Sequence, residues 1–347
     1  QLALAGIYRQ WGEARQGRSQ DPSEQLTRAI ELTDAIAPAE RDAEYDLEVG
    51  LIHTIWADYQ DGAGQDSSAH RRLAIDAYGR AVRIDDRFAG AWLNLGNNYA
   101  RLASQPGAAG ADADLARARE ALARGRALDP TNFAAYLYEG DVYSLLAQRE
   151  QARGADPGPD RARAIELYRQ GAAVSPHEPA FPNALSAEHG LQAQEARDRG
   201  RDPLPLLDQA EAAARQAVAV APDQGFGYSN IGDALSQRAA YLRGRGVDPM
   251  PAARGAEAAF QQALERLPEH ATIWLNLATL HVLVAGVELD RGGDPRARLA
   301  QAGAAIDRAL ALHPSEPGAR ELREEARALH GRWQARSGGG AVSAPAP

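Results

Sequence analysis

The side chains best suited to chemistry in this sequence are amides and carboxylates that recur at fixed positions. Asn94, Asn230 and Asn276 share one position of a repeating pattern, and the last two are 46 residues apart (276 − 230). A carboxamide can donate a hydrogen bond to a backbone C=O and accept one from an N–H. The three amides therefore either bond to neighbouring backbone or contact a ligand, and the sequence leaves both interpretations open. Other polar residues at this position, or three residues beyond it, are Asn97, Tyr138, Asp141 and Asp233.

Two residue types are missing from the chain, and their absence excludes several classes of enzyme. All 38 basic residues are arginine, so no lysine can serve a GxxxxGK[ST] phosphate loop, a protein-kinase active site or a Schiff base. There is no cysteine, which rules out disulfides and thiolate metal sites. The formal charge of −9 argues against a nucleic-acid partner, which requires a basic surface. Arginine without lysine, together with abundant alanine, is typical of a GC-rich genome and favours a bacterial source.

The remaining polar residues form no metal or catalytic pattern. The eight histidines are scattered, without an HExxH motif, and His189 and His281 are expected to be packing residues. Asp58, Asp61 and Asp66 lack the alternating spacing and closing Glu of a calcium loop, so we interpret them as part of a helix junction. We predict no catalytic residue, no metal and no cofactor, and hence no enzyme activity. No apolar run approaches the ~18 residues of a membrane span, and a cytoplasmic location is slightly favoured over an extracytoplasmic one.

The elements that position these residues are marked by a long internal repeat. A proline follows an apolar helical run every 46 residues, from Pro130 to Pro314. Between these closing prolines, apolar residues recur with helical spacing and small residues hold fixed positions. Each unit is therefore predicted to be two antiparallel helices, helix A followed by helix B. The closing positions are Pro38, Asp86, Pro130, Pro176, Pro222, Pro268 and Pro314.

A second repeated motif marks the turn between helix A and helix B. The pattern Arg-Gly-x-Asp-Pro occurs four times, again 46 residues apart. Glycine can take the left-handed conformation just past a helix end, Asp can accept bonds from the free N–H groups of the next helix, and Pro suits the first helical position. The predicted structural turn residues are Gly154, Asp156, Pro157, Gly200, Asp202, Pro203, Gly246, Asp248, Pro249, Gly292, Asp294 and Pro295.

The repeat resembles that of the tetratricopeptide family. The run from Trp92 to Tyr99 matches the family pattern W-x-N-L-G-x-x-Y, and the helix-B alanines and closing proline match in nearly every unit. The family unit has 34 residues, whereas this one has 46, so helices of about 20 residues are expected. The resemblance covers roughly residues 1–314. It implies an all-α, right-handed α-solenoid of about seven antiparallel helix pairs plus a C-terminal capping helix.

The repeat also predicts the domain organisation. A solenoid is expected over residues 1–336, with a polar capping helix over 317–335, followed by a flexible Gly/Ala/Pro tail over 337–347. The chain begins inside a helix A, because Tyr8 matches Tyr99, and we interpret this as a piece cut from a longer protein rather than the product of leader removal. The units are about 1–38, 39–86, 87–130, 131–176, 177–222, 223–268 and 269–314.

The resemblance also implies a function. In the family, helix-A residues line the concave face of a superhelix, and asparagines there hold the backbone of a bound peptide. We therefore expect a non-catalytic protein–protein interaction scaffold. The chaperone-binding members carry Lys and Arg where this chain has Leu93, Leu137, Ser229 and Leu275, so that specificity is not expected. The candidate peptide-binding residues are Asn94, Asn97, Tyr138, Asp141, Asn230, Asp233 and Asn276.

Two finer hypotheses remain open. Long units with Arg-Gly-x-Asp-Pro turns are similar to the C-terminal regions of bacterial serine/threonine protein kinases of eukaryotic type, which implies a docking or regulatory region for a kinase domain upstream. The alternative is a structural protein that assembles head to tail into a filament, since an open solenoid end can make a contact that does not close. The expected partners are a protein or peptide, or a second copy of the chain, but not nucleic acid or a membrane.

Overall fold

The chain folds into helices arranged in two compact units. The computed structural model describes residues 1–18, 20–105, 107–108 and 110–338, and this part of the chain holds fifteen α-helices, a short 3₁₀ helix at Pro38–Glu40 and no strand. Unit 1 spans residues 1–176 and unit 2 spans residues 177–347. The all-α solenoid of helix pairs predicted from the repeat is confirmed within each unit.

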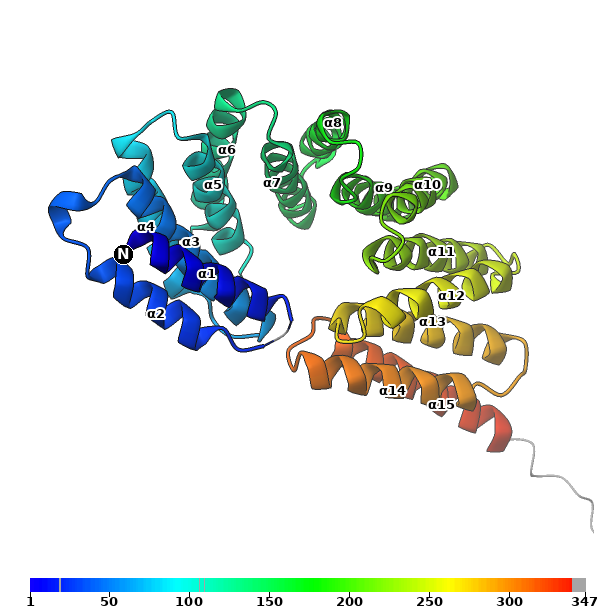
Figure 1. Ribbon diagram of the computed structural model, residues 1–347. Helices are drawn as coiled ribbons and strands as arrows, with labels where there is room; N and C mark the ends of the chain where they lie inside the picture. The colour runs from blue at the N-terminus through cyan, green and yellow to red at the C-terminus, as the bar shows by residue number, and fades with distance from the viewer. Residues whose placement is uncertain (19, 106, 109, 339–347) are drawn as a thin grey trace, which may run out of the picture. The chain divides into compact units, whose positions relative to one another are not determined.

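Unit 1 contains four helix pairs, coloured blue to green in Figure 1. Each helix A packs along its helix B, and each of the first three B helices also contacts helix A of the next pair. The first pair is the shortest, because α2 has only 12 residues. The pairs are α1 (Leu2–Gln16) with α2 (Ser23–Asp34), α3 (Ala43–Gly62) with α4 (Ser68–Ile84), α5 (Ala89–Ala103) with α6 (Ala111–Leu128), and α7 (Phe133–Ala152) with α8 (Gly158–Val174).

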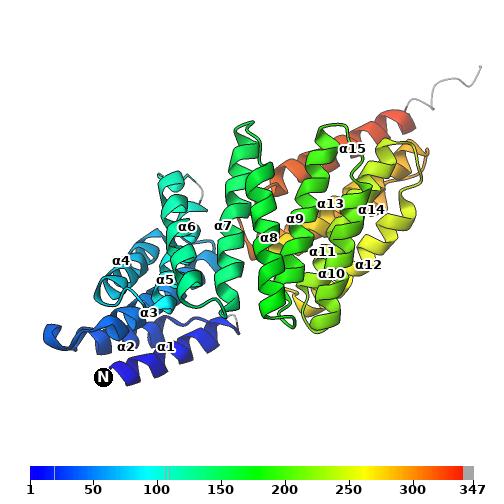
Figure 2. The same cartoon turned by 90° about the horizontal axis from the view of Figure 1, so that it is seen from above.

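Unit 2 contains three helix pairs and a final single helix, α15 (Ala319–Gly338), which packs against α13 and α14. Figure 2 shows α9 to α13 side by side. The capping helix extends past the predicted end at residue 335 and includes the first two residues of the predicted tail, while residues 339–347 lie outside the described residues. The pairs are α9 (Ala180–Asp198) with α10 (Leu204–Val220), α11 (Phe226–Gly244) with α12 (Met250–Arg266), and α13 (Ala271–Asp290) with α14 (Arg296–Leu312).

The Arg-Gly-x-Asp-Pro motif closes four of the A helices, α7, α9, α11 and α13, by backbone geometry. Its four glycines have φ between +70° and +77°, the left-handed region that other residues enter at a cost. At Gly200 the chain also makes the two bonds of a Schellman turn, from Gly200 N to Arg197 O at 2.9 Å and from Arg201 N to Ala196 O at 2.7 Å. The Asp202 carboxylate then accepts from Leu204 N at 3.0 Å, which caps the next helix.

The large aromatic residue six positions after each closing residue also has a physical reason. Trp92 Nε1 donates to Asp86 O, and Trp274 Nε1 donates to Pro268 O, both at 2.9 Å. Tyr136 and Tyr228 make the same bond through their hydroxyl groups to Pro130 O and Pro222 O. A tryptophan or tyrosine therefore serves equally well, because each packs a ring and supplies one donor to the carbonyl of the closing residue.

Glycines in the A helices allow rings of the B helices to approach closely. A Cβ added at Gly50 would lie 2.4 Å from Tyr78, and one at Gly140 would lie 2.4 Å from Tyr168. Tyr78 is fully buried and packs in one cluster with Ala91 of the next pair. The Tyr78 ring therefore joins its own helix pair to the following one.

Helix α13 is apolar along its whole length. Among the described residues it alone is long and apolar enough to cross a bilayer, and 67% of its most apolar window is buried inside unit 2. Counting consecutive apolar residues misses it, because Asn276, Thr279 and His281 interrupt the run. Its burial against α11, α12, α14 and α15 is that of a central core helix.

Candidate functional site

A cleft of about 420 Å³ lies on the helix-A side of unit 2, among α9, α10, α11 and α13. Three of the residues singled out from the sequence line it, namely Asn230 and Asp233 on α11 and Asn276 on α13. Small and apolar residues of α9, among them Ala187, Gly190 and Leu191, form another part of the lining. Further polar residues in the lining are Ser186, Ser236, Gln237 and Thr279.

Hydrogen bonds between neighbouring A helices hold the amides of the cleft in place. Asn230 Nδ2 donates to Asn183 Oδ1 at 3.0 Å, which joins α11 to α9. Asn276 Nδ2 donates to Asp233 Oδ1 at 2.8 Å, which joins α13 to α11. Both amides use their nitrogen atoms in these bonds. Their carbonyl oxygens have no hydrogen-bond partner among the described residues and remain available to a ligand.

Asp233 is the one titratable residue in the lining of the cleft. Its pKa is raised to about 7, because the surrounding protein disfavours the charged form, while the bond from Asn276 opposes this rise. It is only partly exposed. A carboxyl group in this state changes charge near neutral pH, so it can respond to a ligand that favours one protonation state.

The other predicted binding residues lie in unit 1, on α5 and α7. Asn94 Nδ2 donates to Gly90 O of its own helix at 3.0 Å, the backbone bond that was one of the two interpretations from sequence. Asn97 and Tyr138 are partly exposed. Asp141 accepts from the hydroxyl of Tyr168 at 2.8 Å. Asn94 therefore lies in a different unit from Asn230 and Asn276, and the latter two are the asparagines that come together in the described cleft.

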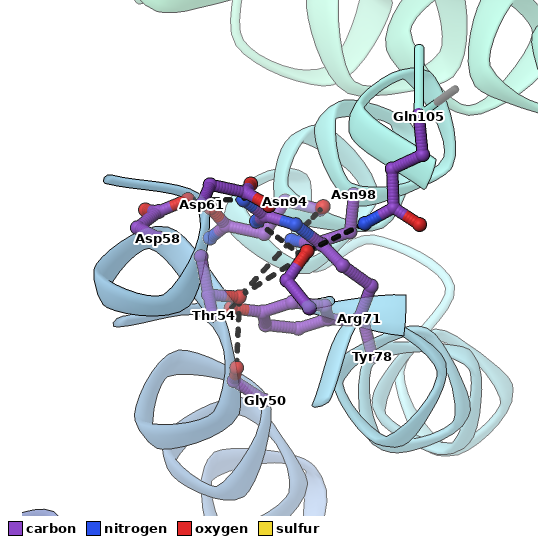
Figure 3. A network of polar contacts seen from close by, with 10 residues as sticks. Gly50, Thr54, Asp58, Asp61, Arg71, Tyr78, Asn94, Asn98 and Gln105 are labelled. Atoms are coloured by element: carbon purple, nitrogen blue, oxygen red, sulfur yellow. Dashed lines mark hydrogen bonds and ion pairs between the residues drawn. The ribbon is translucent and has the colours of Figure 1, made fainter. Parts of the chain in front are cut away.

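A buried polar network lies beside Asn94 (Figure 3), and sequence reasoning missed it. The Arg71 side chain is 1% exposed and donates to Asn98 Oδ1 at 3.2 Å. Asn98 Nδ2 in turn donates to Thr54 Oγ1 at 3.0 Å and to Asn94 O at 2.9 Å. The signal that could have found this network is the arginine itself, because its helix-B position holds leucine or alanine in four of the later helix pairs and arginine again only at Arg161.

The same arginine explains the aspartates that superficially resemble a calcium loop. Arg71 Nη2 forms ion pairs with Asp58 and, at 2.6 Å, with Asp61, so both carboxylates share one guanidinium partner within the fold (Figure 3). Asp66 accepts from Ser68 N at 2.9 Å as a helix cap. Within the described ranges, no group of three or more His, Cys, Asp or Glu side chains could hold a metal ion.

The structure corrects one argument made from sequence. Leu93, Ser229 and Leu275 were compared with the positions of a carboxylate clamp on the ligand-binding face. All three are buried, and a Cβ added at Gly125 of α6 would lie 2.5 Å from Leu93. These positions face the interior of the helix pairs, so they carry no information about charge on the helix-A face. His189 and His281 are buried as expected, at 7% and 5% exposure.

Comparisons with known proteins bear on the fold. No protein-family model and no curated protein matches the sequence. A monomeric mutant of IFIT1 with Gppp-AAAA is similar in structure, with a TM-score of 0.51 and 14% identity over 96% of this chain and 64% of that one. The APC/C hetero-tetramer Cut9–Hcn1 gives a TM-score of 0.50 and 13% identity over 87% of this chain and 52% of that one.

A third structure is TTC0263, described as a thermophilic TPR protein in Thermus thermophilus, with a TM-score of 0.46 and 18% identity over 69% of this chain and 98% of that one. This chain thus spans between about half and two thirds of the length of the two structures with the higher scores. At these identities the likeness concerns the fold. The chain has an α-solenoid fold built from antiparallel helix pairs.

Proposed function

We propose that this chain is a non-catalytic interaction scaffold that binds a segment of a partner protein in the cleft of unit 2. The observation that carries the proposal is the convergence of Asn230, Asp233 and Asn276 on one cleft, with their oxygens free to accept hydrogen bonds. A polypeptide offers backbone N–H groups to such acceptors, and its side chains can pack on Ala187 and Leu191.

The proposal is tested with peptides selected on the purified chain from a random 12-residue display library. The double substitution Asn230→Ala/Asn276→Ala should weaken the selected peptides about tenfold in fluorescence anisotropy, because each hydrogen bond contributes about 0.5–1.5 kcal/mol. The matched control is Gln261→Ala/Gln262→Ala, which removes two exposed amides from α12. Equal affinity of the double variant and the wild type would show that the peptides bind elsewhere.

We propose a second contact region on α5 and α7 of unit 1, which carries Asn97, Tyr138 and Asp141. These two helices contact each other, and the three side chains are partly or largely exposed. Asn97→Ala/Tyr138→Ala should weaken longer selected peptides without changing the affinity of peptides that need only the unit 2 cleft. If no peptide of any length responds to this variant, the second region is not used.

A specific surface also favours the alternative function, head-to-tail assembly. Helix α1 exposes Leu4, Ile7 and Trp11 along one face, and Ile7 is 60% exposed. In a filament, the B helix of another copy would cover this face. Sedimentation velocity should then show concentration-dependent growth that Ile7→Asp/Trp11→Asp abolishes. A single species over a hundredfold range of concentration would contradict assembly.

A role beside a serine/threonine kinase domain rests on the resemblance of the Arg-Gly-x-Asp-Pro turns alone. We propose that the scaffold recruits substrates for such a domain. The parent protein should then phosphorylate proteins that carry the selected peptides faster than proteins that lack them. A parent gene without a kinase domain would end this proposal and leave the scaffold function intact.

A further inference from the structure

The cleft of unit 2 offers a ligand more acceptors than donors. The nitrogen of Asn230 donates to Asn183, and the nitrogen of Asn276 donates to Asp233. The two amide oxygens and the second carboxylate oxygen of Asp233 have no hydrogen-bond partner among the described residues. The residues that line the cleft therefore supply three oxygens without a partner. The two amide oxygens can only accept hydrogen bonds, and the carboxyl oxygen can donate one only when Asp233 is protonated.

The carboxyl group of Asp233 also lacks a compensating charge. No arginine or histidine lines the cleft, and no ion pair of Asp233 occurs in the described part of the chain. Two buried acids of this chain are paired with arginine: Asp46 with Arg80 at 2.7 Å, and Glu139 with Arg126 at 2.6 Å. Because a desolvated carboxylate is costly without a cation or several donors, Asp233 differs from these two acids.

The charged groups on the helices around α11 do not fill this role, because they are engaged elsewhere. Arg238 pairs with Asp208 and lies near Glu211, on the side of α10. Arg243 pairs with Asp290 at the far ends of α11 and α13, ten residues and about 15 Å along the helix from Asp233. Further titratable groups on these helices include buried His189, Glu188 and Glu195 on α9 and buried His281 on α13. Glu257 on α12 and Glu288 on α13 both pair with Arg298. Arg197, Arg215 and Arg266 pair with acids of their own helices.

We propose that this cleft binds a primary ammonium group of the partner peptide, the head of a lysine side chain, between Asp233 and the carboxamide oxygens of Asn230 and Asn276. This inference rests on the proposed peptide-binding function. An ammonium group has three donors and no acceptor, which matches three free oxygens. The four-carbon stem of the lysine packs on Leu191 and Ala234, and Gly190 leaves room for it.

Charge pairing at this site couples binding to the protonation of Asp233. The pKa of Asp233 is raised to about 7 by burial, so a large fraction of the free chain is protonated at pH 6 and little at pH 8. The peptide lysine keeps its charge over this range. Affinity for a lysine peptide should therefore rise from pH 6 to pH 8, with release of a proton on binding at pH 6.

The test uses a peptide selected on the full chain and its variants at one lysine position, with norleucine or acetyl-lysine in place of lysine. At pH 8, wild type should bind the lysine form at least tenfold more tightly than the norleucine or acetyl-lysine form, since hydrogen bonds to charged groups are stronger than those between neutral groups. Asp233→Asn should reduce this preference to less than threefold and remove the pH dependence. Asp223→Asn, which removes the same charge from an exposed position of unit 2, should leave both unchanged.

Each outcome separates this inference from the proposed function. Equal binding of the lysine and norleucine peptides to wild type, or an unchanged preference in Asp233→Asn, would overturn the ammonium site while peptide binding survives. Comparing peptides that have a free or an acetylated N-terminus distinguishes binding of the lysine side chain from binding of the terminal amine. If affinity depends on the free N-terminus and not on the lysine, the lysine assignment is overturned. If Gly190→Leu, which places bulk in the cleft, leaves all peptide binding unchanged, the proposed function itself fails.

Discussion

Gly50 is a position where a single methyl group should disturb the packing of unit 1. A Cβ at Gly50 of α3 would lie 2.4 Å from Tyr78 Cε1 and 2.7 Å from Cδ1 and Cζ. Ordinary contact begins at 3.4 Å, so the ring would have to retreat by about 1 Å (3.4 − 2.4). Tyr78 is fully buried and its hydroxyl lies 3.0 Å from Thr54 Oγ1, which leaves the ring no free space and fixes its far end.

Gly50→Ala should therefore destabilise the chain despite a better helix propensity. Overpacking of this kind costs about 1–3 kcal/mol, and replacing glycine by alanine inside a helix returns up to ~1 kcal/mol. We expect a net loss of roughly 1–2 kcal/mol, measured from the urea midpoint by circular dichroism. The matched control is Gly79→Ala on α4, where the nearest atom to a new Cβ is Arg83 Nη1 at 3.5 Å. That variant should be neutral or stabilised by up to ~1 kcal/mol.

A second variant shows whether the ring is the cause. Gly50→Ala combined with Tyr78→Leu should be less destabilised than the sum of the two single changes, because leucine removes the ring atoms that meet the new methyl group. The reasoning is refuted if Gly50→Ala matches Gly79→Ala in stability, or if the two single effects add without coupling.

Other perturbations test the histidine pair, the turns and the buried arginine. The pKa of His53 is lowered to about 4 by burial and by the adjacent His70 ring, so this histidine takes up a proton at a higher pH in the unfolded chain than in the folded chain. The free energy of unfolding should therefore drop by about 2 kcal/mol between pH 7 and pH 5. An equally steep fall in His53→Asn would contradict this cause. Gly246→Val should lower the free energy of unfolding by about 1 kcal/mol or more, because valine must adopt a φ of +70°. Hydrogen exchange should become faster mainly in α11, α12 and their neighbours. A uniform rise along the chain would count against helix pairs that unfold independently. Arg71→Met should lower the urea midpoint by the equivalent of about 1–3 kcal/mol, since buried Asn98 Oδ1 loses its charged donor and keeps only Thr54 Oγ1 at 3.3 Å. An unchanged midpoint would show that the network contributes no stability.

The local architecture could be predicted from sequence, because each repeated residue type has one local reason to be there. Gly200 needs a left-handed backbone and Asp202 caps the following helix, and both requirements act within a few residues. The alternation of Trp and Tyr at position 92 and its equivalents is also local, since the ring donates to a carbonyl six residues earlier. Such constraints survive in any sequence that folds this way.

The candidate site was harder to locate, because it depends on which helices lie side by side. Asn94, Asn230 and Asn276 share one sequence position, yet Asn94 bonds to its own helix whereas the other two bond to neighbouring helices. The partner of Asn230 is Asn183 of α9. In this helix Phe181-Pro182 takes the place of the Trp or Tyr found at position 92 and its equivalents, and no repeat pattern marks Asn183. The Arg71 network is equally irregular. Its acids Asp58 and Asp61, which we interpreted from sequence as part of a helix junction, lie in the last turns of α3, because this helix continues to Gly62.

The measurement that tests the central claim most directly is the affinity of one selected peptide for Gly190→Leu. A Cβ at Gly190 would meet only Gln237 Nε2 at 3.3 Å, at the end of a flexible side chain, so the fold can accept the substitution while the leucine fills the cleft. Gly303→Leu, on a helical face of α14 with nothing within 4 Å of the new Cβ, is the matched control. The cleft hypothesis predicts at least a tenfold loss of affinity for Gly190→Leu and none for Gly303→Leu, with both variants as helical as the wild type. Wild-type affinity in Gly190→Leu would contradict the hypothesis.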